Sequence, residues 1–367
     1  MFRKPQPIAS LGRTLLTWYD QHHRRLPWRE TRSPYPVWIS EIMLQQTTVE
    51  TVIPYWKRFI ERLPDVEALA AATEDRVLTL WAGLGYYRRA RFLRAAARHI
   101  VDVHGGRFPR TVEGLRALPG IGTYTAAAIA SICFDVREPV VDGNVIRVLG
   151  RCLALEEDPR RGTGRRRIEA AAREILDPAR PGDSNQALME VGAMVCRPRS
   201  PRCSACPLAP GCAGRAGGNP ETYPPPPTRS PMVEVCRLGV IVEDFQGRLL
   251  LRRVPAGEHN AGLWELPWIP VEAPHPGISA PLRRRLEDAV GFPLTGITGP
   301  VAEIRHVITR HRIQLRLHRA RPAGPAPRSR RGWRWLPPAQ AGRLALTGAT
   351  GSALGTFHRG AKRVHRG

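Results

Sequence analysis

The sequence predicts a multi-domain protein in which an all-helical domain is followed by an α+β domain. Two observations support this prediction: the spacing of apolar residues changes midway along the chain, and a proline-rich run stands where it changes. Apolar residues recur with a helical period through residues 10–220, beginning with Leu11, Leu15, Leu16, Trp18 and Tyr19. A length of 367 residues also favours two domains over one.

The proline-rich run marks the end of the helical domain. The sequence Tyr223-Pro-Pro-Pro-Pro-Thr cannot continue a helix or a central strand, because proline lacks the backbone N–H that both structures use. We therefore expect a helical domain at residues 1–215 and a semi-rigid linker at residues 216–232.

Apolar and polar residues alternate beyond the linker, which predicts β-strands. The pattern favours strands at residues 236–243 and 248–254 and a helix at residues 281–290. We expect this α+β domain to span residues 233–345, followed by a flexible basic tail at residues 346–367.

The charge balance indicates a polyanionic partner. The formal net charge is +24, and it comes almost entirely from arginine, since Lys4, Lys57 and Lys362 are the lysines of the chain. A genome-wide arginine bias contributes to this excess, but it does not explain why so few acidic residues oppose it.

The sequence also favours a cytoplasmic location. No stretch reaches the roughly 18 apolar residues of a membrane span, and Met1–Ser10 lacks the apolar core of a signal peptide. The chain has 7 cysteines, and their clustering fits a reducing compartment better than a disulfide framework.

Four cysteines, Cys196, Cys203, Cys206 and Cys212, follow the spacing C-x6-C-x2-C-x5-C. Thiolates this close in sequence can converge on one soft metal centre, either a tetrahedral zinc ion or a [4Fe-4S] cluster. Structural zinc sites usually combine two short knuckles, whereas only one is present here, between Cys203 and Cys206. The spacing therefore favours the cluster and leaves a structural zinc loop as the alternative.

A glycine-containing turn, Leu118-Pro-Gly-Ile-Gly122, separates two helical patterns. Gly120 and Gly122 let backbone N–H groups approach a phosphate, and the helix expected at residues 123–133 offers its N-terminus to the same anion. A plain helix–helix turn is the alternative. Twenty residues later, Asp142 stands at a loop-to-helix junction, where N-capping is its simplest role.

These motifs together resemble the helix-hairpin-helix DNA glycosylase superfamily. The cysteine loop resembles that of the endonuclease III and MutY branch, and the segment from Trp38 to Thr47 resembles the active-site helix of MutY-type adenine DNA glycosylases. Leu26-Pro-Trp-Arg29 and Gly83-Leu-Gly-Tyr-Tyr87 resemble the same family, so the resemblance covers residues 10–220 in order. It implies a helix-hairpin-helix core with a [4Fe-4S] loop at residues 196–212.

The resemblance implies how two carboxyl groups divide the chemistry. Glu41 lies in a strongly apolar stretch, so burial should raise its pKa and let it act as the acid that protonates adenine at N7. By resemblance, Asp142 stabilises the cationic sugar, and Asn144 orients these groups. An exposed helical glutamate is the alternative for Glu41 alone.

One position separates two subtypes of the superfamily. In the bifunctional relatives a lysine after the hairpin attacks the sugar, whereas this chain has Tyr124 at that position. The resemblance therefore implies a monofunctional glycosylase in which Tyr124 is a further catalytic residue that shapes the sugar pocket. It also implies that Leu44, Gln46 and Tyr86 enter the DNA where the base is flipped out, while core packing is the alternative for Tyr86.

The second domain resembles the MutT-like (Nudix-like) domain with which MutY enzymes recognise 8-oxoguanine. Gly262-Leu-Trp-Glu-Leu-Pro267 is typical of it, but arginine and alanine replace metal-binding carboxylates between Arg284 and Gly291. The damage-reading loop of the family corresponds to His306–His311, where we expect His306, Thr309 and His311 to contact DNA.

The sequence as a whole predicts a base-excision-repair adenine DNA glycosylase acting on double-stranded DNA with 8-oxoguanine·adenine or guanine·adenine mispairs. We expect a monomer that is associated with the nucleoid. The alternatives are an endonuclease III-like bifunctional glycosylase and AP lyase, or a non-catalytic iron–sulfur protein that only binds lesions.

Overall fold

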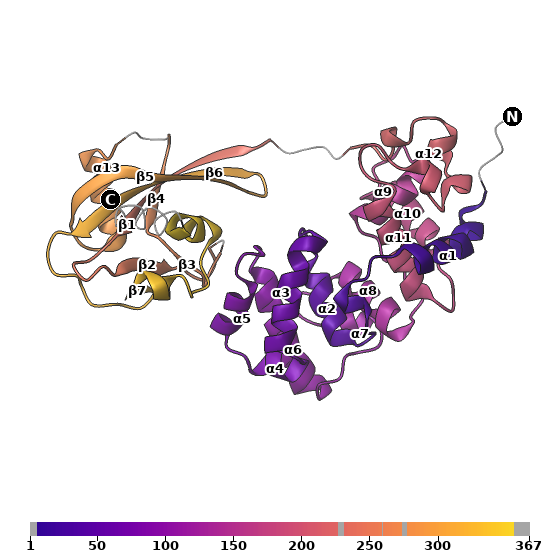
Figure 1. Ribbon diagram of the computed structural model, residues 1–367, viewed down its shortest axis with the longest axis horizontal. Helices are drawn as coiled ribbons and strands as arrows, with labels where there is room; N and C mark the ends of the chain where they lie inside the picture. Colours follow the sequence, from indigo (N-terminus) through magenta and orange to yellow (C-terminus); the bar gives the residue numbers. More distant parts are fainter. Residues whose placement is uncertain (1–5, 227–230, 259, 274–276, 356–367) are drawn as a thin grey trace. The chain divides into compact units, whose positions relative to one another are not determined.

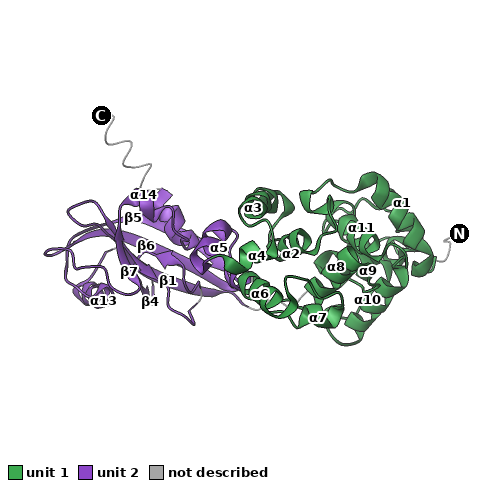
Figure 2. Cartoon of the chain, turned by 90° about the horizontal axis from the view of Figure 1, so that it is seen from below, with its two compact units in different colours: residues 1–72, 92–228 green, residues 73–91, 229–367 purple. Residues whose placement is uncertain are grey.

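The computed structural model describes residues 6–226, 231–258, 260–273 and 277–355 (Figure 1). The chain divides into two compact units (Figure 2). The first comprises residues 1–72 and 92–228, and the second comprises residues 73–91 and 229–367. No helix in these described ranges is both long and apolar enough to cross a membrane.

The first unit is built from helices. Its α-helices are α1 (Gly12–His22), α2 (Pro34–Met43), α3 (Val49–Arg62), α4 (Val66–Ala71), most of α6 (Arg88–His104), α7 (Val112–Arg116), α8 (Thr123–Phe134), α9 (Gly143–Cys152), α10 (Gly162–Ile175), α11 (Pro181–Met194) and α12 (Ala213–Ala216). Short 3-10 helices are η1 (Ile8–Leu11), η2 (Pro27–Arg29), η3 (Cys203–Ala205), η4 (Ala209–Gly211) and η5 (Pro220–Thr222).

Helix α8 lies at the centre of this unit because its side chains are small. Its residues from Thr125 to Ile132 are all buried, and the helix contacts α2, α7 and α11. Alanine favours helix formation and allows neighbouring helices to approach closely. The helix ends where Asp135 adopts a left-handed conformation with φ of 55°.

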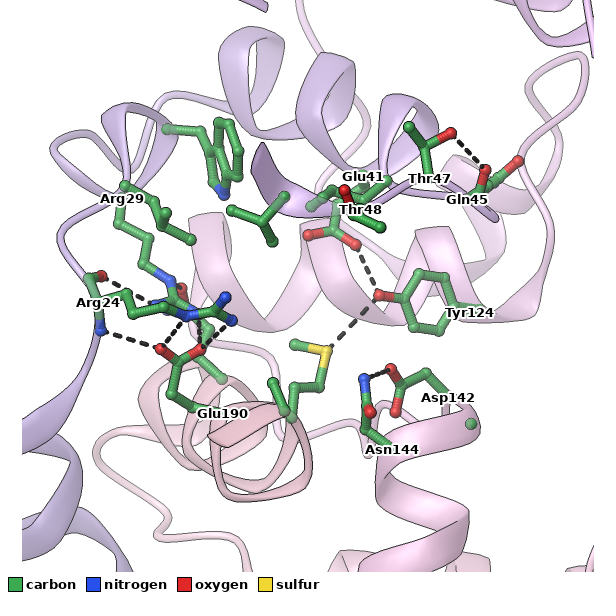
Figure 3. Close-up of a pocket in the computed structure, with 18 of the residues that line it drawn as sticks. Arg24, Arg29, Glu41, Gln45, Thr47, Thr48, Tyr124, Asp142, Asn144 and Glu190 are labelled. Carbon is green, nitrogen blue, oxygen red and sulfur yellow. Dashed lines mark hydrogen bonds and ion pairs between the residues drawn. The ribbon is translucent and has the colours of Figure 1, made fainter. Parts of the chain in front are cut away.

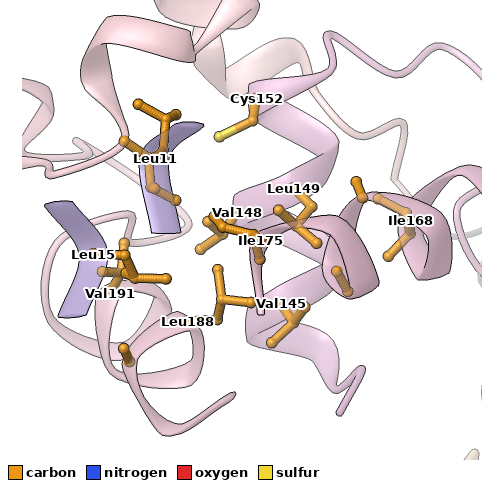
Figure 4. Packing of buried hydrophobic residues seen from close by; sticks show 14 of the residues in the cluster. Leu11, Leu15, Val145, Val148, Leu149, Cys152, Ile168, Ile175, Leu188 and Val191 are labelled. Atoms are coloured by element: carbon orange, nitrogen blue, oxygen red, sulfur yellow. The ribbon is translucent and has the colours of Figure 1, made fainter. Parts of the chain in front are cut away.

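A second apolar cluster joins α1, α9, α10 and α11 (Figure 4). Leu15, Val145, Leu149, Ile168 and Leu188 are fully buried in it, with relative exposures of 0%. This cluster fixes α9 from its first turn to its last, and both ends of α9 belong to candidate sites described below.

The second unit contains two sheets and few helices. Its elements are α5 (Glu74–Trp81), β1 (Val233–Val242), β2 (Leu249–Arg253), β3 (Trp264–Glu265), β4 (Trp268–Val271), α13 (Ala280–Val290), β5 (Leu294–Ile308), β6 (His311–Pro322), β7 (Trp333–Leu336) and α14 (Pro338–Ala341). One sheet has the strand order β4-β1-β6-β5 and the other has the order β3-β2-β7.

Strand β1 pairs in parallel with β6, and β5 pairs antiparallel with β6 to form a long hairpin. Opposite faces of β1 enter different apolar clusters, as the alternation of its side chains dictates. Leu238 and Val240 pack in a cluster that includes α13, whereas Ile241 packs in a cluster that includes Leu354.

The prediction of a flexible tail from residue 346 is wrong for residues 346–355. The backbone of Leu346 bridges to Trp264, residues 348–355 are helical, and Ala353 and Leu354 are buried. The sequence suggested a tail because small residues and glycine hide the helical period. In the structure Ala353 and Leu354 are buried in an apolar cluster of the second unit, and Leu346 and Ala349 pack against it. Residues 356–367 lie outside the described residues.

The beginning of the predicted linker packs on the first unit. The guanidinium of Arg151 donates to the carbonyl of Tyr223 over 3.2 Å. A Cβ added to Gly150 would lie 3.1 Å from the ring of Pro224, which shows how closely that ring covers α9. Residues 227–230 of the linker lie outside the described residues.

Candidate active site

A cavity of about 870 Å³ opens in the first unit between η2, α2, α8 and α11. Glu41, Tyr124, Asp142 and Asn144 all line it, although they lie up to 103 residues apart in the sequence. Figure 3 shows Glu41 and Tyr124 facing each other, with Asp142 and Asn144 on the same side of the cavity. The structure thus brings together the four residues that the sequence proposed as catalytic.

Glu41 is buried, as its apolar neighbours on α2 predict. Its side chain is reached by the Tyr124 hydroxyl, which donates to Glu41 Oε2 over 2.8 Å. Burial raises the pKa of Glu41 to about 7, and the charge of Asp142 adds to this effect, while the Tyr124 hydrogen bond opposes it. A carboxyl group with such a pKa is available as a proton donor near neutral pH.

Tyr124 is the second residue of α8, so its ring enters the cavity from the same helix that follows the glycine turn. Its hydroxyl also lies 3.6 Å from Met189 Sδ. Burial first, and then the charge of Glu41, raise the pKa of Tyr124 well above its ordinary value, so the hydroxyl stays protonated and acts as a donor.

Asp142 occupies a more polar environment than Glu41. As the N-cap of α9, it accepts a hydrogen bond from the Val145 backbone N–H over 2.7 Å, and Asn144 Nδ2 donates to Asp142 Oδ2 over 2.9 Å. Burial raises the pKa of Asp142, and these hydrogen bonds oppose the increase by stabilising the carboxylate. Asp142 therefore has the capping role that its position suggested, in addition to facing the cavity.

Arg147 connects this carboxylate to the cysteine loop. Its guanidinium donates to Asn144 Oδ1 over 2.8 Å and to the carbonyl of Cys196 over 2.7 Å. Arg147 therefore holds both Asn144, whose side chain orients Asp142, and the cysteine loop.

The opposite side of the cavity carries three charged residues that the sequence reasoning missed (Figure 3). Glu190 accepts from Arg24 Nε over 2.8 Å and from Arg29 Nη2 over 2.9 Å. Burial acts to raise the pKa of Glu190, but hydrogen bonds from both arginines outweigh it and lower the pKa to about 2. Arg29 belonged to a recognised motif but had no assigned role. No sequence signal links Glu190 to Arg29, which lies 161 positions earlier, or to Arg24, which lies 166 positions earlier.

The glycine turn has the geometry that was expected of it. Gly120 has φ of 75°, and a Cβ there would lie 2.4 Å from Phe92, so both conformation and space require glycine. Gly122 is the N-cap of α8, and a Cβ there would meet no atom within 4 Å. No side chain caps this end of α8.

Two of the three proposed wedge residues, Gln46 and Tyr86, have unusual backbone conformations. Gln46 is exposed at the end of α2 with φ of 59°, and Leu44 lies beside it on the rim of the cavity. In the second unit, Tyr86 has φ of 47° and is 39% exposed, whereas Tyr87 is buried and its hydroxyl donates to the carbonyl of Leu346. Positive φ in residues other than glycine is uncommon and often occurs at functional sites.

The β5–β6 hairpin separates the three residues proposed to read the damage. Thr309 lies at the exposed tip with φ of 52°, and His311 follows it as the first residue of β6. His306 lies within β5 opposite Ile313 and lines a cavity with Arg237 and Trp268. Burial, with the charge of Arg237, lowers the pKa of His306. Of the three residues, Thr309 and His311 lie at the tip and His306 lies within the strand.

The four loop cysteines line one small, apolar cavity beside α9, together with Cys152. Within the described residues no group of three or more His, Cys, Asp or Glu side chains has the arrangement of a metal site. The donor set nevertheless fits an iron–sulfur cluster, since four thiols surround one cavity and Arg151 donates to Cys196 Sγ over 3.3 Å. We therefore treat the cluster as a proposal below.

Comparisons with known proteins agree for both units. Residues 39–178 match the HhH-GPD superfamily base excision DNA repair protein family, and residues 238–354 match the NUDIX domain family. A solved structure of a thermostable thymine-DNA glycosylase aligns with a TM-score of 0.51 and 28% identity, covering 57% of this chain and 96% of that one.

Curated relatives include adenine DNA glycosylases from animals and bacteria. The Rattus norvegicus protein is 43% identical over 279 residues, covering 73% of this chain and 52% of the relative. The Homo sapiens protein is 47% identical over 224 residues, covering 59% of this chain and 41% of the relative. The protein of Buchnera aphidicola subsp. Schizaphis graminum is 39% identical over 222 residues, covering 59% of this chain and 63% of the relative. The chain thus spans about half the length of the first relatives it matches. Residues 39–178 are thus similar to the helix-hairpin-helix base excision DNA repair superfamily, and 73% of the chain is similar to a curated adenine DNA glycosylase.

Proposed function

We propose that this chain is a monofunctional adenine DNA glycosylase. It would flip adenine out of a mispair with 8-oxoguanine or guanine and hydrolyse the bond between adenine and the sugar. The observation that carries this proposal is the pair of carboxyl groups in one cavity, Glu41 in an apolar environment and Asp142 in a hydrogen-bonded one. Such a division suits a reaction that needs one acid and one anion.

The proposed reaction begins when protonated Glu41 donates its proton to adenine N7. The bond between adenine N9 and sugar C1′ then breaks, and its electron pair leaves with the neutral base. The Asp142 carboxylate, which accepts hydrogen bonds from Asn144 and from the N-terminus of α9, would stabilise the positive charge that develops on the sugar. A water molecule attacks C1′ and passes its proton to the Glu41 carboxylate, which restores the acid and leaves an abasic site.

Tyr124 supports the monofunctional subtype in this proposal. Its hydroxyl is hydrogen-bonded to Glu41, and an unionised phenol at this place cannot form a Schiff base with the sugar. The group of Arg24, Arg29 and Glu190 on the opposite wall offers charged donors and acceptors to the edge of a purine. We propose that this group holds the flipped base while Glu41 protonates it.

A glycosylase assay separates the proposal from its two rivals. On an 8-oxoguanine·adenine duplex, we expect strand breaks only after alkali or heat, and no efficient covalent complex with borohydride. Breaks without alkali, together with borohydride trapping, would favour a bifunctional glycosylase and lyase. Tight binding to the same duplex with no excision would favour a non-catalytic lesion-binding protein.

We propose that Cys196, Cys203, Cys206 and Cys212 hold a [4Fe-4S] cluster. When bound, such a cluster supplies fold stability and support for DNA binding, since it offers neither an acid nor a nucleophile to the sugar. Protein purified anaerobically should then carry about four irons per chain. Stoichiometric zinc without iron after the same preparation would contradict this part of the proposal.

We propose that the second unit reads the base opposite adenine through the tip of the β5–β6 hairpin. Thr309 and His311 lie there, whereas His306 faces a cavity of its own unit. Thr309→Ala combined with His311→Ala should lower the ratio of single-turnover rates on 8-oxoguanine·adenine and guanine·adenine duplexes, with His306→Gln as the control. An unchanged ratio in the double variant would contradict the assignment.

The excess of arginine would contribute phosphate contacts, so binding should weaken steeply as salt is raised. We further propose that the enzyme acts as a monomer on the nucleoid within the cytoplasm.

A further inference from the structure

One face of α11 packs against both α8 and α9. Gly182, Asn185, Met189 and Gly192 recur every three or four residues along α11, so they share this face. A Cβ added to Gly182 would lie 2.5 Å from the carbonyl oxygen of Ser131 on α8, which shows how closely the two helices approach. This face therefore holds together the two helices whose first turns border the cavity.

Asn185 is fully buried on this face, with a relative exposure of 0%. Its Oδ1 accepts a hydrogen bond from the Val140 backbone N–H over 2.9 Å. Its Nδ2 donates to the Glu138 carbonyl over 2.9 Å and to Ser131 Oγ over 3.0 Å. Asp142 follows Val140 by two residues, so the side chain of Asn185 fixes the backbone from which that carboxylate projects.

Gly192 lies on the same face, about two turns after Asn185. A Cβ there would lie 2.5 Å from the Cβ of Asn144 and 3.1 Å from its Cα, so only glycine leaves room for this contact. The carbonyl of Gly192 also accepts from Arg147 Nη2 over 2.7 Å. Because Asn144 donates to Asp142, the missing side chain at Gly192 determines where the group that orients this carboxylate can lie.

We propose that Asn185 and Gly192 are positioning residues that set the place of the Asp142 carboxylate relative to Glu41. This inference rests on the proposed glycosylase reaction, and it assigns a role to two residues that do not line the cavity. Asn185 fixes the backbone before Asp142 and Gly192 fixes Asn144 after it, so the carboxylate is held from both sides. A misplacement of about 1 Å in such a group can lower the rate of a reaction by about 100-fold.

The test compares full-length wild type with Asn185→Leu, Gly192→Ala and Ser184→Ala. Leucine branches at the same atom as asparagine but makes none of its three hydrogen bonds. Ser184 is the matched control because it is the preceding residue of α11 and is equally buried, but its Oγ accepts from the backbone N–H of Asp177. Gly192→Ala keeps the test decisive where Asn185→Leu fails to fold, because alanine favours a helix more than glycine does.

Rate and affinity should respond differently in these proteins. On an 8-oxoguanine·adenine duplex, we expect Asn185→Leu and Gly192→Ala to lower the single-turnover excision rate by about 10- to 100-fold. The dissociation constant for the same duplex should stay close to that of wild type, because neither residue lines the cavity. Ser184→Ala should keep both the rate and the affinity of wild type.

The pH profile separates a displaced carboxylate from a general loss of stability. The charge of Asp142 raises the pKa of Glu41, so an Asp142 that is held less closely should raise it less. The basic limb of the excision rate should therefore move to lower pH in both variants. Arg29 and Tyr124 also face Glu41, and neither is changed by these substitutions.

Hydrogen exchange gives a readout that does not depend on excision. The Val145 N–H donates to Asp142 Oδ1, so it reports whether this carboxylate stays in place. In Asn185→Leu and Gly192→Ala, it should exchange faster than in wild type and Ser184→Ala, relative to the N–H groups in the last turn of α9.

Excision rates in both variants that match Ser184→Ala would overturn the proposal. A loss of rate with an unmoved basic limb would also overturn it. Wild-type protein that excises no adenine would reject the proposed reaction, while the exchange of the Val145 N–H would still decide whether α11 fixes Asp142.

Discussion

Replacing Tyr124 with phenylalanine tests the proposed acid catalysis through its pH dependence. The Tyr124 hydroxyl donates to Glu41 Oε2 over 2.8 Å and stabilises the ionised carboxylate. Tyr124→Phe keeps the ring but removes this donor. The pKa of Glu41 should therefore rise above its present value of about 7.

The size of the rise follows from the strength of the lost bond. A hydrogen bond to a charged group contributes about 1.5–3 kcal/mol, and one pKa unit corresponds to about 1.4 kcal/mol. The expected increase is therefore about one to two units. Because Glu41 must be protonated to act as the acid, wild-type excision should fall about tenfold per pH unit above pH 7, and the variant should begin this fall at about pH 8–9.

The assay is the single-turnover rate of adenine excision from a duplex, measured between about pH 5 and 10. Tyr35→Phe is the matched control, because it also removes a buried hydroxyl, one that donates to the carbonyl of Leu63 and does not line the cavity. The control should keep the wild-type pH profile. An unchanged basic limb in Tyr124→Phe, or one moved to lower pH, would refute the coupling between Tyr124 and Glu41.

Three further variants test the same site. Glu41→Gln should bind the mispair but lose excision by ~10²–10⁴-fold or more. The same variant should become more stable than the wild type at high pH. In the wild type, Glu41 has a pKa near 7 when folded and an ordinary value of 4.5, so the protein loses free energy of unfolding as pH rises from 4.5 through 7. This loss, about 3 kcal/mol, should appear in urea unfolding of the wild type at pH 5 and pH 9. Asp142→Asn should abolish excision. It should change the free energy of unfolding by no more than about 1 kcal/mol, since asparagine caps the N-terminus of α9 as well as aspartate does. Arg147→Met should lower the excision rate by about 10- to 100-fold with a smaller effect on DNA affinity, because Asn144 loses the donor that orients it.

Local features of this site could be predicted from the sequence because they depend on neighbours along the chain. The apolar stretch around Glu41 predicted its burial, and the glycine turn predicted the start of the helix at Thr123, where the structure has α8. Strand alternation placed β1 and β2 within a few residues of their observed bounds. Each of these inferences needed only a period or a turn signal.

Contacts between distant segments could not be predicted in this way. Glu190 joins Arg24 and Arg29 only because α11 packs beside η2, and one sequence without relatives contains no signal of that packing. The inward position of His306 depends on the register of β5 against β6, which places it opposite Ile313 and away from the hairpin tip. Cys152 lies at the cavity of the four loop cysteines only because the loop folds back on α9, and no spacing in the sequence indicates this.

Helix α9 is the element that relates the two proposed centres. Asp142 caps its N-terminus, Cys152 ends it, and its 10 residues span about 15 Å at 1.5 Å per residue. Its apolar face is fixed in the core by Val145 and Leu149, so the two ends cannot move independently. Arg147 lies midway and holds both Asn144 and the carbonyl of Cys196. A disturbance of the cysteine loop should therefore reach the Asp142 carboxylate through this helix and its arginine, and a cluster that takes no part in the reaction would still affect the rate of excision.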